Sequence, residues 1–255
     1  MKVMRKILFL IILSSITTYS QTVQKDTLQF KGDFSLSGSL TDGVEFQRTF
    51  QFEFNPTFEK TSWSLENKFR FLFSDADDEV LNRNWDALVL YKFYINGKKK
   101  WYPFLVTNVE TNLAYELELR LGSGGGLAYK PTFKNGNKIL FAFASIYYRN
   151  RYTESIFVNS NRMGNQRNML RLVLHYNGST QILKDKILLK TDGWFLQSTR
   201  ERTDYIFKLY AGIEFKLTKI FSLTAIYRYN YENVSLESLD NNQQFASIGI
   251  KGNFD

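Results

Sequence analysis

The sequence predicts an all-β protein: a closed, antiparallel transmembrane barrel of about twelve strands. Apolar and polar residues alternate along a dozen segments. In the first, residues 28–40, apolar Phe30 and Phe34 are interleaved with polar Lys31 and Asp33, which gives a strand one apolar and one polar face. The chain also begins with a secretory leader, and no later stretch has the roughly 20 consecutive apolar residues of a membrane helix. A closed barrel is the strand structure that a bilayer tolerates.

Residues 1–20 form the expected leader, and residues 21–255 form a single expected domain. In the leader, three basic residues precede the apolar run 7–12, and small and polar residues then place the cleavage before Gln21. The apolar run is too short to span a bilayer as a helix. We therefore expect an exported protein of the outer membrane of a Gram-negative bacterium.

The composition fits this location and excludes other classes. Aromatic residues make up 16% of the chain, as suits a barrel with aromatic girdles, and only 3 prolines occur. Without cysteine, the chain can form neither a disulfide nor a lipidated N-terminal cysteine. The formal net charge of +8 falls to about +5 without the three bases of the leader. Because the remaining bases are scattered, no nucleic-acid partner is expected, and the sequence indicates no cofactor.

The first segments set the period at two. In residues 46–55, phenylalanines alternate with Gln, Thr and Glu, and in residues 62–73, Trp, Leu and Phe alternate with Ser, Glu, Lys and Arg. Residues 85–95 form the fourth predicted strand. These segments place an apolar face toward lipid and a charged face toward the lumen.

The middle segments are less regular. Residues 101–109 and 139–149 are apolar on both sides, so their phase stays open and the strand count can lie between ten and fourteen. Between them, residues 118–133 carry the run GSGGG. The segments 169–177 and 187–196 complete this part.

The last segments are the clearest. Residues 205–217 and 221–231 alternate strictly and are separated only by the dipeptide TK, which predicts a hairpin. The final strand, 244–254, ends in Phe254. This aromatic ending is typical of strands that the barrel-assembly machinery recognises, although one aspartate follows it. Twelve strands place both chain ends on the periplasmic side.

Connection lengths support this orientation, because bacterial barrels have short periplasmic turns and longer outer loops. The short connections are 56–61, 96–100, 134–137, 178–186 and 218–219, and the outer ones are 41–45, 74–84, 110–117, 150–168, 197–204 and 232–243. The single exception to the alternation is the tight Asp42-Gly43 turn of the first hairpin.

The strand phases assign side chains to the lumen and to the lipid interface. The predicted lumen residues are Lys31, Asp33, Glu53, Glu66, Lys68, Arg70, Arg120, Arg171, Lys208, Glu214 and Arg228. The predicted aromatic girdle consists of Trp63, Phe71, Phe73, Tyr205, Phe215, Phe221, Tyr229 and Tyr231.

The inward charges allow two interpretations. They pair across the lumen and plug it, or they line a narrow aqueous path that favours anions. Buried charge is costly unless it is paired, and bases outnumber acids, so some bases must be hydrated or meet an acidic solute. We favour the narrow wet lumen.

The single histidine, His175, raises the question of lipid hydrolysis. A histidine near asparagine and serine in a twelve-strand barrel resembles the outer-membrane phospholipase A family. That family, however, places a serine two residues after the histidine, where this chain has Asn177. The phase of His175 also points it into the lumen near the periplasmic rim, away from the outer lipid surface. We interpret it as an ordinary lumen histidine.

Two further clusters receive structural interpretations. Asp75, Asp77, Asp78 and Glu79 lie in a predicted outer loop and could collect Ca²⁺, but they lack the spacing of an EF-hand, so a solvated loop is favoured. The glycines of GSGGG precede no helix, so they form no phosphate cradle, and we expect them to make room for packing inside the barrel.

The chain resembles the domain of unknown function family 481, often labelled salt-induced outer-membrane proteins. The resemblance rests on SLSGSLTDGVEF, LELRLGSGGGLAYKPTF, ASIYYRNRYTE, IYRYNYEN and FASIGIKGNF. It implies an outer-membrane barrel and brings no established activity or site residues.

We therefore expect a non-enzymatic outer-membrane barrel that is either a narrow, anion-leaning channel or a structural protein of the stressed envelope. Its expected partners are outer-membrane lipid, lipopolysaccharide and the barrel-assembly machinery. The alternatives are a phospholipase-like enzyme, which would need a nucleophile set at the outer leaflet, and a secreted lipocalin-like binder, which would bury its aromatic face.

Overall fold

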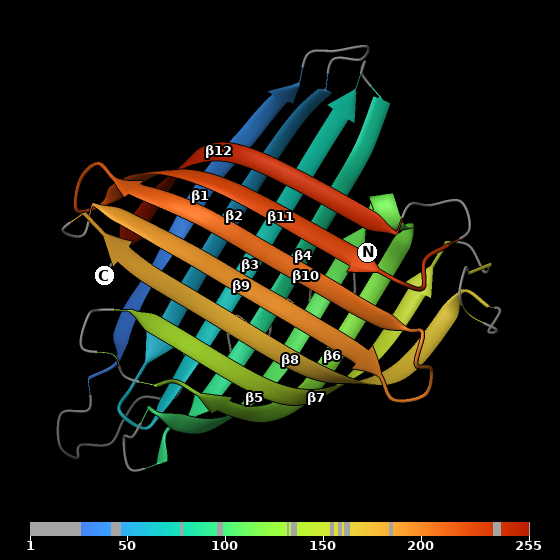
Figure 1. The fold of residues 1–255 in the computed structure, drawn as a ribbon, viewed down its shortest axis with the longest axis horizontal. Helices are drawn as coiled ribbons and strands as arrows, with labels where there is room; N and C mark the ends of the chain where they lie inside the picture. The colour runs from blue at the N-terminus through green and yellow to red at the C-terminus, as the bar shows by residue number, and fades with distance from the viewer. Residues whose placement is uncertain are drawn as a thin grey trace.

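The protein folds as a closed antiparallel barrel of twelve strands, seen in a computed structural model (Figure 1). The structure describes residues 27–41, 47–76, 79–95, 99–131, 133, 137–153, 156–157, 160, 164–183, 186–236 and 241–254. Each strand pairs with its neighbours in the chain, and the last closes onto the first. The predicted leader and the Asp42-Gly43 turn lie outside the described residues.

The strands are β1 (Gln29–Thr41), β2 (Gln47–Glu59), β3 (Trp63–Ala76), β4 (Glu79–Phe93), β5 (Trp101–Asn112), β6 (Leu117–Tyr129), β7 (Lys138–Tyr152), β8 (Gln166–Ile182), β9 (Ile187–Ser198), β10 (Tyr205–Lys216), β11 (Phe221–Glu232) and β12 (Asn242–Phe254). A short 3-10 helix, η2 (Leu113–Tyr115), joins β5 to β6. The prediction of a twelve-strand barrel is confirmed.

Several strands are longer than predicted, so some connections are shorter. β2 continues through Pro56, which was expected to start a turn. Proline has no N–H to donate, and the ladder between β2 and β3 passes from the Phe54–Phe69 pair to the Thr57–Glu66 pair without pairing Pro56. The predicted loop 74–84 is likewise mostly strand.

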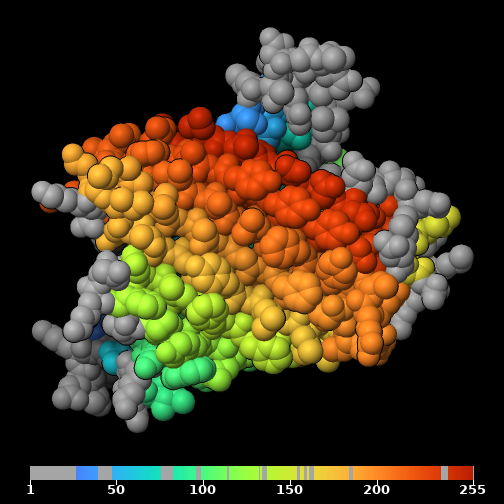
Figure 2. Space-filling view, in the orientation of Figure 1, coloured from blue at the N-terminus to red at the C-terminus, as the bar shows by residue number. Residues whose placement is uncertain are grey.

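The outer face of the barrel is apolar. Phe30, Leu105 and Ile250 are each about half exposed, as side chains that face lipid rather than a packed core should be. In the space-filling view, the side chains of β8 to β12 form a continuous surface (Figure 2). Within the described residues, no helix has the length and apolar character to cross a membrane.

The predicted girdle residues all lie on strands, with the phase of the outer face. Tyr205 and Tyr231 lie beside the outer connections with ring centroids 5.8 Å apart. At the opposite rim, Trp63 stacks on Tyr91 at 5.9 Å. The other members are Phe71, Phe73, Phe215, Phe221 and Tyr229.

The interior is divided into an apolar half and a charged half. Buried apolar side chains from β5, β7, β8 and β9 pack together inside the barrel. Three consecutive inward positions in the middle of β6, between Arg120 and Ala128, are Gly122, Gly124 and Gly126, and residues of β5 and β7 pack over them. A Cβ on Gly124 would overlap the backbone of β7, which accounts for the glycine there.

The pairing between β1 and β12 covers only part of either strand. It runs from the Gly32–Phe254 pair to the Gly38–Ile248 pair, whereas β1 pairs with β2 along its whole length. The outer ends of β1 and β12 therefore diverge, and Figure 1 shows β1 to β4 extending past β12.

Candidate pore and its constriction

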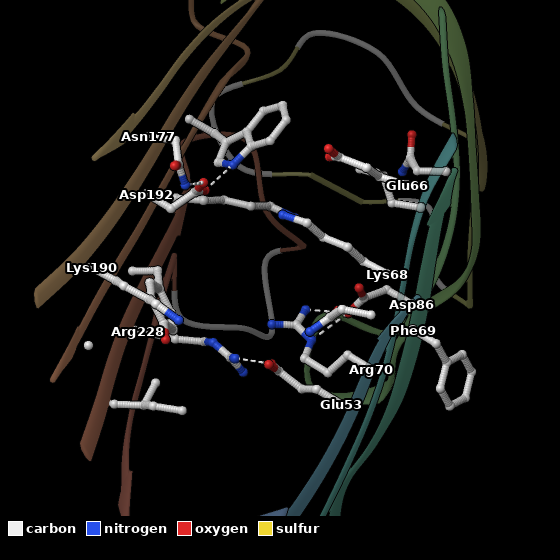
Figure 3. A pocket seen from close by; sticks show the side chains of 18 of the residues that line it. Glu53, Glu66, Lys68, Phe69, Arg70, Asp86, Asn177, Lys190, Asp192 and Arg228 are labelled. Carbon is white, nitrogen blue, oxygen red and sulfur yellow. Dashed lines mark hydrogen bonds and ion pairs between the residues drawn. The ribbon is translucent and has the colours of Figure 1, made fainter. Parts of the chain in front are cut away.

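A cavity of about 790 Å³ occupies the centre of the barrel. Side chains approach it from two facing walls (Figure 3): Glu66, Lys68 and Arg70 from β3, and Lys190 and Asp192 from β9. Phe69, between two inward residues, points away from the cavity, as period-two alternation requires.

All eleven predicted lumen residues border this cavity: Lys31, Asp33, Glu53, Glu66, Lys68, Arg70, Arg120, Arg171, Lys208, Glu214 and Arg228. The prediction omitted Trp194 and Tyr210, which also line it. Both share the inward phase of charged residues on their own strands, Asp192 and Lys208, and this phase could have identified them.

Ion pairs bridge the charged half. Arg228 on β11 donates to Glu53 and Gln51 on β2, and Figure 3 shows the Arg228–Glu53 contact crossing the cavity. Near the rim at which β9 begins and β10 ends, the Lys190 Nζ lies 2.7 Å from Glu214 Oε2. Pairing of this kind compensates the desolvation of each charge.

A second cavity of about 260 Å³ lies toward the rim at which β3 and β5 end. It shares Arg70, Asp86, Glu110, Arg228 and Asn230 with the central cavity. These residues therefore form the partition between the two spaces. We call this set the constriction; within it, Arg70 is bonded to Asp86.

A clamp joins opposite sides of the barrel next to the constriction. Arg120 on β6 donates from Nη1 and Nη2 to the two carboxylate oxygens of Glu232 on β11, at 3.0 Å each. Lys208 on β10 reaches Glu110 on β5 at 3.3 Å. These residues come from strands five apart in the barrel order, so the clamp narrows the lumen.

Outside the clamp, an apolar cluster covers part of the mouth. Tyr115 from η2 and Phe157, Val234 and Leu236 from outer connections are buried against one another, and Phe157 and Leu236 form a β-bridge. Burial, with the nearby Glu232 carboxylate, raises the pKa of the Tyr115 phenol well above its ordinary value. The smaller cavity at the same end of the barrel is lined mainly by polar residues such as Asn84 and Gln243.

Charge in the central cavity is biased toward bases. Among the described residues that line it, ten are Lys or Arg and seven are Asp or Glu. Lys68 makes no ion pair or hydrogen bond with any residue that the structure describes, and its side chain extends into the cavity (Figure 3). The ammonium group also interacts electrostatically, at longer range, with the carboxylates of Glu53 and Asp192. Because it is accessible from the cavity and forms no direct ion pair, it favours anions at this point.

His175 lies in a polar network on the wall opposite Lys68. Its Nε2 is 2.9 Å from Asp192 Oδ2, and its ring stacks on Trp194 with centroids 3.8 Å apart. Asn177 donates to the same carboxylate oxygen at 2.8 Å. No serine or threonine hydroxyl among the described residues is bonded to His175.

The acidic cluster was predicted to lie in a solvated loop, and the structure differs at Asp75. Asp75 lies on β3 and accepts two hydrogen bonds from Arg48, at 3.0 and 2.7 Å. Asp77 and Asp78 lie outside the described residues. Across the described part of the chain, no group of three or more His, Asp or Glu residues is placed to hold a metal ion.

Comparison with known proteins identifies the fold. The family model described as "Protein of unknown function, DUF481" matches residues 34–251. No curated protein gives a significant match. Among solved structures, the NanC porin is 8% identical, with a TM-score of 0.51 over 89% of this chain and 100% of its own. The KdgM porin has 8% identity and a TM-score of 0.46 over 88% and 99%.

An anion-selective porin from Comamonas acidovorans also aligns, with 8% identity and a TM-score of 0.42 over 89% of this chain and 99% of its own. At 8% sequence identity, the similarity concerns the fold alone, and the alignment with the NanC porin is the one that supports it.

Proposed function

Because the chain belongs to the DUF481 family and shares the barrel fold of outer-membrane porins, we propose that it is a narrow, anion-leaning channel of a Gram-negative outer membrane. The solute enters by the polar side of the mouth, passes the constriction and reaches the central cavity. The clamp and its apolar cover restrict passage to small solutes.

The observation that carries this proposal is the exposed ammonium group of Lys68, which forms no direct ion pair with a described residue, in a cavity where bases outnumber acids. A dry, plugged lumen would need a partner for each buried charge. Lys68 forms no direct ion pair or hydrogen bond with a described residue, and it is exposed to the cavity, so its position supports a lumen that water and mobile anions enter.

A structural role in the envelope is the second candidate. It is supported by the contact between Arg228 and Glu53, which crosses the lumen, and by the clamp of Arg120 and Glu232. A barrel whose cross-lumen pairs stay closed would conduct no ions. We propose no enzymatic activity, since His175 faces a carboxylate and an indole rather than a nucleophile.

The test is the reversal potential of the purified protein in planar bilayers under a KCl gradient. We expect discrete conductance steps with a preference for chloride, and a lower preference in Lys68→Glu. Lys219→Glu, on the exposed periplasmic turn, has the same change of charge outside the lumen and should leave the preference unchanged. Absence of conductance would favour the structural role, and a preference for potassium would contradict the proposal.

A further inference from the structure

We propose that the central cavity binds small organic carboxylates with an apolar or aromatic body, with the carboxylate at Lys68 and the body against the apolar half of the lumen. The inference rests on the proposed channel function and names its class of solute. It is based on three features that line the same cavity.

The first feature is the position of Lys68 at the edge of the apolar half. On the strand ladder, Lys68 of β3 lies directly opposite Leu88 of β4. Leu88 packs against the buried apolar cluster and is itself only half-buried. The Lys68 side chain and the apolar surface are therefore neighbours, at the spacing of one cross-strand pair.

The second feature is the apolar border of the cavity itself. Val106, Ile146, Leu196 and Ile206, from four different strands, line the same space as Lys68. Water at such a surface has few hydrogen-bonding partners, so an apolar group that displaces it gains free energy. A fully hydrated anion such as a sugar acid would gain nothing from this border.

The third feature is the indole of Trp194, which also lines the cavity. One of its faces is covered by the His175 ring, and its Nε1 donates to Asp192. Both contacts fix the orientation of the ring. A fixed, half-buried indole beside an apolar surface is a suitable contact for an aromatic ring.

Size and charge agree with this class of ligand. A volume of about 790 Å³ falls within the range of about 300–1,000 Å³ that small-molecule sites occupy. Asp192 already accepts hydrogen bonds from Asn177 and Trp194 and contacts His175. The Asp192 carboxylate, on the wall opposite Lys68, is therefore already engaged by three neighbours, which favours an anionic over a cationic ligand at this point.

The test is equilibrium dialysis of radiolabelled phenylbutyrate against the protein in nanodiscs, with empty nanodiscs as the blank for partition into lipid. Phenylbutanol, which lacks the charge, and gluconate, which lacks the apolar body, are the comparison ligands. We expect phenylbutyrate to bind at least about tenfold more tightly than either, because loss of an ionic contact or of apolar burial costs about this much.

Two variants separate the contributions. Lys68→Gln should weaken phenylbutyrate binding about tenfold and leave phenylbutanol unchanged. Leu88→Ser should weaken both about threefold to tenfold. Lys219→Gln is the matched control and should change neither. Circular dichroism of each variant checks that the barrel is intact.

The outcomes distinguish this inference from the channel function. Three outcomes would overturn the inference. Gluconate and phenylbutyrate bind equally well, phenylbutyrate is not retained above the empty-nanodisc blank, or its retention is the same in Lys68→Gln as in the wild type. Selective binding without conductance in bilayers would support the binding site and contradict the channel. Conductance without selective binding would support the channel and contradict the binding site.

Discussion

Arg120 and Glu232 face each other across the barrel and are joined by two parallel hydrogen bonds, although their strands are five apart in the barrel order. Both side chains are almost completely buried. Removing one partner leaves the other charge uncompensated, so Arg120→Met should lower the free energy of unfolding by about 3–5 kcal/mol. Urea unfolding in lipid vesicles, followed by tryptophan fluorescence, measures the change.

The matched double variant isolates the ionic contribution. Arg120→Met combined with Glu232→Leu removes both charges, and its stability should recover most of the loss. A single Arg120→Met variant as stable as the wild type would show that the pair is solvated in the membrane-embedded protein.

Glycine at position 124 is required by the close approach of β7. A Cβ there would overlap the Ser145 carbonyl oxygen and would lie 2.7 Å from the Ile146 Cα, both of which belong to the backbone. Gly124→Ala should therefore cost about 1–3 kcal/mol in the same unfolding measurement. Gly193→Ala is the control, because nothing lies within 4 Å of its added Cβ. Equal stability of the two variants would contradict the packing interpretation.

The constriction should control selectivity through Arg228 and its partner Glu53. In bilayers under a KCl gradient, Glu53→Gln should raise the preference for chloride, because it leaves Arg228 without its carboxylate. Arg228→Gln should lower the preference for chloride, because it removes the positive charge of the same pair. Shifts of the reversal potential in the same direction for both variants would show that the pair lies outside the conducting path.

His175 should have no part in lipid hydrolysis. His175→Ala and the wild type should both release fatty acid from phospholipid vesicles at the background rate, because the ring is engaged by Asp192 and Trp194. A hydrolytic rate in the wild type that falls in the variant would overturn this expectation.

Calcium should leave the barrel unchanged near Asp75. This carboxylate already accepts two hydrogen bonds from Arg48, so it gains little from a metal ion. The temperature at which the folded band disappears on an SDS gel should be the same with Ca²⁺ and with a chelator. A rise with Ca²⁺ that Asp75→Asn abolishes would contradict the prediction.

Period-two alternation was sufficient to predict the wall of this protein. Side chains on one strand face opposite sides in turn, so the inward positions of Lys68 and Arg70 follow from their neighbours alone. The same rule failed on β5, where both faces are apolar. There the structure places Val106 inside and leaves Leu105 55% exposed.

Cross-barrel contacts could not be predicted, because they depend on the shape of the closed sheet rather than on any one strand. Glu232 lies at the end of β11, in a segment that the sequence placed in a loop. Glu232 comes into contact with Arg120 only because the sheet closes into a barrel. The strand through Pro56 was missed for a local reason: the ladder between β2 and β3 leaves that residue unpaired, while β1 still pairs with it through Gly32, and no sequence pattern marks this arrangement.

The incomplete seam between β1 and β12 sets the depth at which the barrel sits. Beyond the Gly38–Ile248 pair, each strand has a backbone edge that the other does not cover. Unpaired peptide groups are not tolerated in hydrocarbon, so the acyl chains must end at or before this rung. Phe50 and Phe73 lie on the same rung, where aromatic residues of an interface belong. The outer ends of β1 and β12, with their uncovered backbone edges, thus stand in the headgroup layer or in water.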